Sequence, residues 1–193
     1  MKPTAFFAAM TLTLATPVLA SNWELDSAHT SAEFKVRHLM ISNVPGKFSG
    51  VKGFVNLDDA NPAKSKVEAT IDTSTVNTDN QKRDEHLRSG DFFDVKKFPT
   101  MKFVSRSVKK TGDGTFEVAG DLTMHGVSKP VVLQASLTPE MKDPFGGTRR
   151  GMTATTKINR KDFGLNWNKA LEAGGVMVSD DVNIEINSEM TKK

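Results

Sequence analysis

The four histidines are the side chains best suited to hold a metal ion or to move a proton near neutral pH. They are His29, His38, His86 and His125, and no pair has the His-x-His or His-x-x-x-His spacing of a metal site built from one segment. The chain has no cysteine, which excludes thiolate sites, disulfides and cysteine nucleophiles. We therefore expect no metal site, with ligands gathered from distant segments as the alternative.

The stretch Arg83-Asp84-Glu85-His86 is the nearest approach to an acid–base group. No Gly-x-Ser-x-Gly elbow and no glycine-rich phosphate loop occurs in the chain. Charged side chains that pair with one another on an exposed helix do not form a reaction centre, so we expect that the protein is not an enzyme. His86 is expected to join Arg83, Asp84 and Asp91 in an ion-pair cluster.

The composition indicates a single folded domain. The chain has 193 residues, of which 37% are hydrophobic and 7% aromatic, which suffices for one sizeable core and argues against wholesale disorder. There are 26 basic and 23 acidic residues, and no run of five or more lysines or arginines occurs. A net charge of +3 without a basic block predicts that nucleic acid is not a partner.

The first twenty residues are typical of a secretory signal peptide. Lys2 supplies the positive start, residues 5–15 are apolar apart from threonines, and Val18-Leu19-Ala20 places small residues at the cleavage positions. This apolar stretch is too short to span a membrane. We expect cleavage after Ala20, a single mature domain of residues 21–193, and a location in a bacterial periplasm.

Most of the remaining chain alternates apolar with polar residues, which indicates strands with one buried face. In residues 32–38, for example, Glu33, Lys35 and Arg37 separate less polar side chains. Short turns join most of the runs, so neighbouring strands should be antiparallel. We expect a short strand around Trp23–Leu25 and then eight long strands that start near Ser31, Lys47, Ser65, Thr100, Thr115, Pro130, Arg149 and Val176.

One segment, about residues 79–89, is predicted to be helical. Thr78-x-x-Gln81 fits a capping box at its start, and Gly90 fits the stop signal after its end. The helix is too short and polar to stand alone, so it should dock, through Leu87 and the following Phe92-Phe93.

Eight amphipathic antiparallel strands can bury their apolar faces in a two-sheet sandwich or in a closed barrel, which also removes exposed edges. An eight-stranded barrel is about wide enough for side chains alone or for one slim ligand. Small residues such as Ala69, Gly120, Ala135 and Ala154 interrupt the apolar stripes, which favours an internal apolar tunnel. The alternative is a barrel packed solid with side chains, acting as an interaction or stress-response module.

Blocks spread over residues 22–190 resemble the YceI-like family, and they occur in the same order. The blocks are WELDSAHT (23–30), FKVRH (34–38), RDEHLRSGDFFDV (83–95) with the following Pro99, GDLT (120–123) and RKDFGL (160–165).

The resemblance implies an extended eight-stranded antiparallel barrel, similar to a lipocalin, with the one short helix packed at the barrel. It also implies export, and a binding or carrier role for a long isoprenoid chain, a polyprenyl or quinone-type lipid, held in the barrel interior. Apart from such a bound lipid or quinone, no cofactor is expected. A transient contact with a membrane, or with a membrane redox or lipid protein, and a homodimer are compatible with the sequence.

The residues expected to contact the ligand face inward in the stripes or are aromatic, and plain core packing is the alternative for each. For His38, a structural hydrogen bond is favoured over contact with a head group. The expected residues are Phe34, Val36, His38, Phe48, Ala69, Ile71, Phe103, Phe116, Val118, Leu122, Leu133, Ala135, Ala154, Phe163 and Trp167.

Overall fold

The computed structural model describes residues 20–171 and 174–193, so the expected signal peptide lies outside the described residues except for Ala20. The described residues form ten strands, one α-helix and three short 3-10 turns. The strands are β1 (Ser21–His38), β2 (Ser42–Phe48), β3 (Lys52–Leu57), β4 (Lys66–Asp72), β5 (Thr100–Gly112), β6 (Thr115–Met124), β7 (Val127–Leu137), β8 (Met141–Lys142), β9 (Thr148–Asn159) and β10 (Val178–Lys192). The other elements are α1 (Gln81–Arg88), η1 (Pro62–Lys64), η2 (Thr73–Thr75) and η3 (Arg160–Phe163).

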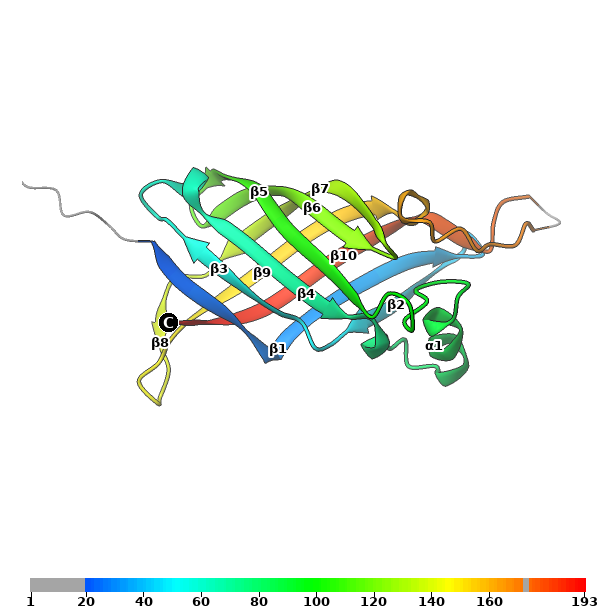
Figure 1. The fold of residues 1–193 in the computed structure, drawn as a ribbon, viewed down its shortest axis with the longest axis horizontal. Helices are drawn as coiled ribbons and strands as arrows, with labels where there is room; N and C mark the ends of the chain where they lie inside the picture. The colour runs from blue at the N-terminus through cyan, green and yellow to red at the C-terminus, as the bar shows by residue number, and fades with distance from the viewer. Residues whose placement is uncertain (1–19, 172–173) are drawn as a thin grey trace, which may run out of the picture.

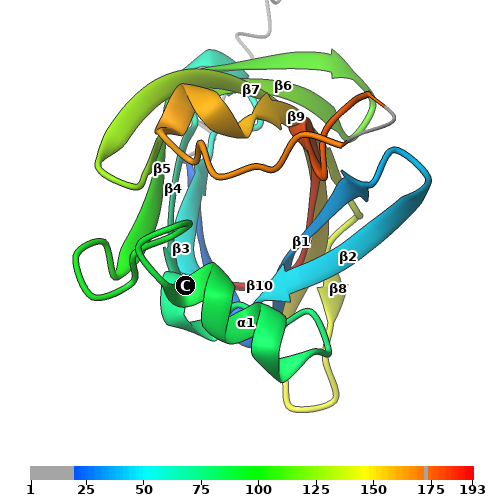
Figure 2. The same cartoon turned by 90° about the vertical axis from the view of Figure 1, so that its right-hand side faces the viewer.

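Eight of these strands close into an antiparallel barrel, which confirms the predicted fold class (Figure 1). The order is β10-β1-β3-β4-β5-β6-β7-β9, and β9 pairs back onto β10, so the sheet closes on itself and does not form a two-sheet sandwich. The strands surround a common interior, and α1 lies across one end (Figure 2). We call this end, with α1 and η3, the helix end.

The first strand is longer than predicted. The short strand around Trp23–Leu25 and the strand from Ser31 form one element, β1, with a bulge between Leu25 and Thr30. Asp26 stabilises the bulge, because its carboxylate accepts the Ala28 N–H at 3.1 Å and its carbonyl accepts the Thr30 hydroxyl at 2.7 Å. The local hydrogen bonds of one aspartate therefore keep the strand continuous across an irregular stretch.

The strand expected from Lys47 is divided in two. β2 and β3 both pair with β1, and between them Gly50 adopts a left-handed φ of 69°. At Gly53 the backbones of β3 and β4 lie close together. A Cβ atom at this position would lie 2.1 Å from the Glu68 carbonyl oxygen of β4, so only glycine fits there. Gly50 and Gly53 thus mark a bend between two strands.

β7 and β9 are paired over only part of their length. The register runs from Gln134 opposite Thr155 to Leu137 opposite Met152. Beyond it, towards the helix end, residues 127–133 of β7 and 156–159 of β9 have no ladder pairs with each other in the described structure. The two strands therefore diverge over this part of the wall, which we call the β7–β9 split.

The predicted helix exists, but its N-cap is Asn80 and not Thr78. The Asn80 side chain accepts a hydrogen bond from the Arg83 N–H at 3.1 Å, as an N-cap does. Thr78 instead donates its N–H and its hydroxyl to Asp84, which is buried. The predicted docking of the helix is confirmed, because Leu87 and the following two phenylalanines pack against the core.

The expected ion-pair cluster around His86 is only partly present. His86 Nε2 lies 2.8 Å from the Asp91 carboxylate, as predicted. Arg83 and Asp84 bind Thr78 instead, because the buried carboxylate of Asp84 needs hydrogen-bond donors close to it.

The end of the barrel opposite α1 is filled by side chains, and we call it the closed end. Trp23 and Met190 are fully buried there, beside Leu57, which is 3% exposed. Trp23 donates its indole N–H to Ser21 at 2.9 Å, and the Lys192 ammonium lies 5.4 Å from its ring. Among the described residues, no helix has the length and apolarity needed to cross a membrane.

Candidate ligand-binding site

An apolar cavity occupies the middle of the barrel and continues to the helix end. The cavity has a volume of about 190 Å³. Its walls come from β1, β2, β4 to β7, β9 and β10 and from Val51 before β3, with residues of α1, of η3 and of the segments that follow them at one end. The interior is therefore an elongated space suited to one slim apolar molecule.

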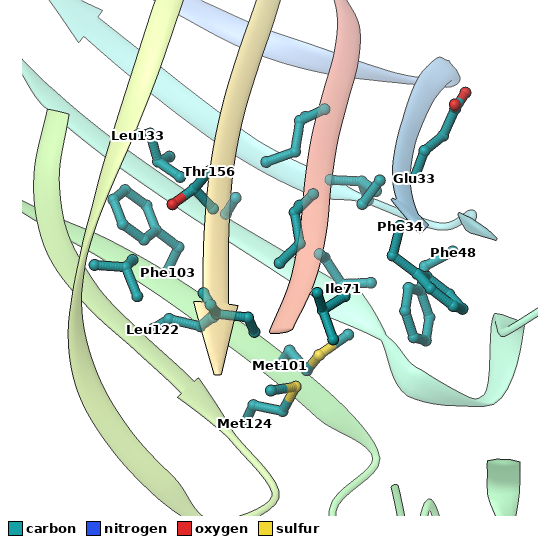
Figure 3. A pocket seen from close by; sticks show the side chains of 18 of the residues that line it. Glu33, Phe34, Phe48, Ile71, Met101, Phe103, Leu122, Met124, Leu133 and Thr156 are labelled. Atoms are coloured by element: carbon teal, nitrogen blue, oxygen red, sulfur yellow. The ribbon is translucent and has the colours of Figure 1, made fainter. Parts of the chain in front are cut away.

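The lining consists mostly of aliphatic, methionine and phenylalanine side chains, as the close-up shows (Figure 3). Phe34 and Phe48 lie together on one wall, with ring centroids 5.6 Å apart. Met101 and Met124 meet near another part of the cavity, where their flexible thioethers can adapt to different shapes. Glu33 is part of the lining, but its carboxylate points away from the other labelled side chains.

The cavity stops before the closed end. Leu25 and Met152 are its last lining residues in that direction. Met190, which pairs with Leu25, is completely buried and does not line the cavity, and Trp23 behaves in the same way. A ligand chain that reaches this point meets packed side chains.

At the helix end the cavity is lined by Leu87, Phe92 and Phe93. Phe92 belongs to an aromatic group that bridges α1 to the segment after η3. Its ring lies 5.1 Å from the His86 ring and 5.2 Å from the Trp167 ring, and His86 and Trp167 are 4.9 Å apart in an edge-to-face arrangement. The helix is thereby fixed over the end of the barrel.

Arg160 is the buried cation of this end, with only 4% of its surface exposed. Its guanidinium donates hydrogen bonds to the carbonyls of Leu165, Trp167 and Ser179, the last at 2.9 Å, and Asp180 lies 3.6 Å away. Burial lowers the pKa of Arg160, and the negative charge of Asp180 opposes this effect. Arg160 therefore organises the segment that covers the cavity, because its hydrogen bonds are directed to the backbone.

Eleven of the fifteen residues expected to contact a ligand line the cavity in the described structure. They are Phe34, Val36, Phe48, Ala69, Ile71, Phe103, Val118, Leu122, Leu133, Ala135 and Ala154.

The other four expected residues, His38, Phe116, Phe163 and Trp167, are not among the described lining residues. His38 pairs with Ser42 and Val178 where β1 ends. Phe116 and Phe163 are buried in core clusters, and Trp167 packs on the outer side of Phe92 against His86. Phe163 and Trp167 lie outside the strands, so alternation gives no information about the direction of their side chains.

Further residues line the cavity that were not predicted to contact a ligand. Some continue the predicted stripes and could have been found from period two: Val67, Val131, Met152, Thr156, Ile158, Val182, Ile184 and Ile186. Others, such as Leu87, Phe93 and Leu165, lie outside the strands, and no periodic signal marks them.

A charged network lies on the outer surface, around the β1 bulge. The Arg149 guanidinium bonds the carboxylates of Asp26 at 2.9 Å, Asp143 at 3.0 Å and Glu189 at 3.1 Å. His29 Nδ1 lies 3.0 Å from Asp26. Asp26, His29 and Glu189 bring three metal-type ligand atoms within 4.8 Å, but Arg149 already supplies the positive charge between the two carboxylates. The arrangement is thus an ion-pair network that connects β1, β9 and β10.

The pKa of His29 is expected to lie above its ordinary value, because Asp26 accepts its hydrogen bond and Glu189 adds negative charge. The contribution of this contact to stability is therefore complete below the pKa of an unfolded histidine and is lost as the pH rises through the raised folded-state pKa. An NMR titration of the imidazole protons measures this pKa directly. Asp26→Asn should lower it more than Glu189→Gln does, and equal or reversed effects would contradict the assignment.

Comparison with known proteins gives the same fold and a family. The YceI-like domain model matches residues 23–190. A UPF0312 protein of Pseudomonas fluorescens is 43% identical over 182 residues, covering 91% of this chain and 89% of that protein. The crystal structure of the Campylobacter jejuni YceI protein is similar with a TM-score of 0.70 and 36% identity, covering 81% of this chain and 89% of that one.

A third similar structure is a polyisoprenoid-binding domain from Saccharophagus degradans. It has a TM-score of 0.65 at 16% identity and covers 89% of this chain and 98% of that one, so the likeness concerns the fold. The domain match and the relatives, together with the closed barrel, confirm the resemblance found in the sequence: the chain belongs to the YceI-like family.

Proposed function

We propose that this protein binds one long, slim apolar lipid of the polyisoprenoid or isoprenoid-quinone type inside its barrel. The observation that carries the proposal is the elongated apolar cavity, closed by Trp23 and Met190 at one end and reaching α1 at the other. The polyisoprenoid-binding domain of S. degradans has the same fold, which supports this class of ligand. The alternative of a barrel packed solid has no support from an interior with this much free space.

The expected free energy of binding an isoprenoid chain is compatible with a carrier role. Burying roughly 600 Å² of isoprenoid chain contributes about 15 kcal/mol before the costs of association. Those costs are about 4–15 kcal/mol, so binding can be tight and still reversible without a charged contact.

A binding role without catalysis fits the charged groups near the cavity. Lys102 is part of the lining, but its ammonium lies 3.3 Å from Glu68 in a half-exposed ion pair. Arg160 directs its donors to backbone carbonyls. These groups have structural partners, and they do not converge on a common point where a substrate would react.

We further propose that the carrier works in the periplasm after its first twenty residues are removed. The composition of residues 1–20 supports export. Expression of the full chain in a Gram-negative host, followed by fractionation and N-terminal sequencing, should find periplasmic protein that begins at Ser21. Protein that stays in the cytoplasm with Met1 intact would contradict this part of the proposal.

The ligand proposal is tested by extracting the purified exported protein with organic solvent and identifying lipids by mass spectrometry. We expect about one isoprenoid lipid for each chain, and delipidated protein should take up an added polyprenol. Repeated extraction without lipid, combined with no uptake of either a polyprenol or an isoprenoid quinone, would overturn the proposal.

A further inference from the structure

The free space inside the barrel ends within two rows of residues on the wall formed by β1, β10 and β9. These strands are neighbours, and their paired inward-facing residues form rows across the three of them (Figure 1). Three successive rows line the cavity completely: Val36, Val182 and Ile158; Phe34, Ile184 and Thr156; Ala32, Ile186 and Ala154. In the next row towards the closed end, Met152 lines the cavity but Thr30 and Ser188 do not. In the row after it, Leu25 lines the cavity and its partner Met190 does not.

Two buried hydroxyl groups connect β1 to β10 at the depth where the lining stops. The hydroxyl oxygens of Thr30 and Ser188 lie 2.8 Å apart, and both residues are buried. The Thr30 hydroxyl also donates to the Asp26 carbonyl within the bulge of β1. An apolar chain offers no hydrogen bond, so a chain that pushed these groups apart would leave buried hydroxyls short of a partner, at a large cost. This row therefore limits the depth that an apolar chain can reach.

Leu25 lies between the free space and the packed side chains of the closed end. Its side chain borders the cavity on one side and is itself buried. Trp23, on the same face of β1, and Met190, opposite Leu25 on β10, are completely buried and do not line the cavity. A chain that is longer than the cavity must therefore project at the helix end, because the closed end gives it no way out.

We propose that Leu25 is the stop for the tail of the bound chain and thereby sets the number of isoprene units that the barrel accepts. The inference rests on the proposed function, because it concerns the length of the lipid that the cavity binds. A polar head group costs free energy in an apolar lining, so it stays at the helix end while the tail lies against Leu25. The units that exceed this length then remain outside the barrel, in water.

The experiment is a competition between chains of different length. Delipidated mature protein is mixed with detergent micelles that contain equal amounts of all-trans polyprenols, each one isoprene unit longer than the last. The bound lipids are extracted and their lengths are measured by mass spectrometry. Each CH₂ group held in water instead of in the micelle lowers the affinity about fourfold. The wild type should therefore have an upper length limit, and the first chain beyond it should be bound at least about tenfold less than the longest accepted chain.

The variant Leu25→Ala should move this limit to a longer chain. The substitution removes Cγ and both Cδ atoms next to the free space, and a void with apolar walls stays free of water and open to an apolar ligand. The first polyprenol that the wild type rejects should gain about tenfold in its share of the bound lipid, because part of its extra unit is no longer in water.

Leu57→Ala is the matched control. Leu57 is also buried at the closed end, and the same atoms are removed, but this residue does not line the cavity. The void left there is separated from the bound chain, so the distribution of lengths should equal that of the wild type.

Ala32→Leu should move the limit in the opposite direction. Ala32 lies in the last row that lines the cavity completely, and its replacement fills free space instead of opening a void. The longest chain that the wild type accepts should lose at least about tenfold of its share. Circular dichroism confirms that each variant is folded, and Ala32→Leu decides the question by itself if Leu25→Ala does not fold.

The proposal is overturned if folded Ala32→Leu protein binds the same lengths as the wild type, or if folded Leu25→Ala protein does so. It is also overturned if Leu57→Ala shifts the limit as far as Leu25→Ala does. A wild type that binds polyprenols of every length equally well would keep the proposed function and exclude a stop at Leu25. If the wild type takes up no polyprenol of any length, the proposed function itself fails, and the stop fails with it.

Discussion

Replacing Ala135 by phenylalanine should weaken lipid affinity about tenfold, because an overpacking cost within the range of about 1–3 kcal/mol corresponds to a change in affinity of this order. Ala135 lies on β7, faces the cavity and pairs with Ala154 of β9. A phenyl ring from this position would enter a cavity of about 190 Å³. An isoprenoid chain carries no polar group along its length, so it cannot offset the lost apolar contact with a hydrogen bond elsewhere.

The measurement is uptake of a polyprenol by delipidated protein, with circular dichroism to confirm that the barrel is folded. Gln134→Phe is the matched control, because the neighbouring residue on the same strand is exposed and faces outward. The control should bind normally. A folded Ala135→Phe protein with unchanged uptake would show that the ligand does not reach this part of the barrel.

Replacing Trp23 by alanine should cost about 3–5 kcal/mol of unfolding free energy, the range for removing a large buried aromatic side chain. Trp23 is completely buried at the closed end, its indole N–H is hydrogen-bonded to Ser21, and the Arg150 guanidinium lies 5.6 Å from its ring. The substitution therefore leaves a void and removes cation–π contacts as well.

Urea denaturation of the mature chain measures this loss. Phe145→Ala is the control at the same end, because Phe145 is 95% exposed and its removal should change the unfolding free energy by less than about 0.5 kcal/mol. A loss below about 1 kcal/mol for Trp23→Ala would mean that the closed end is not packed as described.

The alternation of apolar residues was sufficient to predict the strands and the face that each turns inward. Phe34, Ala69 and Ala154 were chosen on that basis, and all three line the cavity. Phe116 shows where this reasoning ends. It lies in an inward stripe and is buried in a core cluster near the β5–β6 turn, yet it is not among the described lining residues, because alternation gives the face of a strand and does not show which inward side chains border the free space.

The helix end was the part that the sequence predicted least well. Leu87 and Leu165 line the cavity from outside the strands, and Trp167 packs behind Phe92. Their places depend on long-range hydrogen bonds, such as those from Arg160 to backbone carbonyls. Local sequence signals also did not show that the hydrogen bonds of Asp26 make β1 one continuous strand.

The β7–β9 split has a consequence for the width of ligand that the barrel accepts. Continuous hydrogen-bonded ladders fix the spacing between neighbouring strands at about 4.8 Å. A barrel whose strands are all paired along their full length therefore has a fixed diameter. Here β7 and β9 have no ladder pairs at Val131 and Ile158, and both residues line the cavity. Widening of the barrel at this seam would break no ladder bond between β7 and β9, so we expect a branched or ring-bearing segment of a ligand to be accommodated more readily near the helix end than near the closed end.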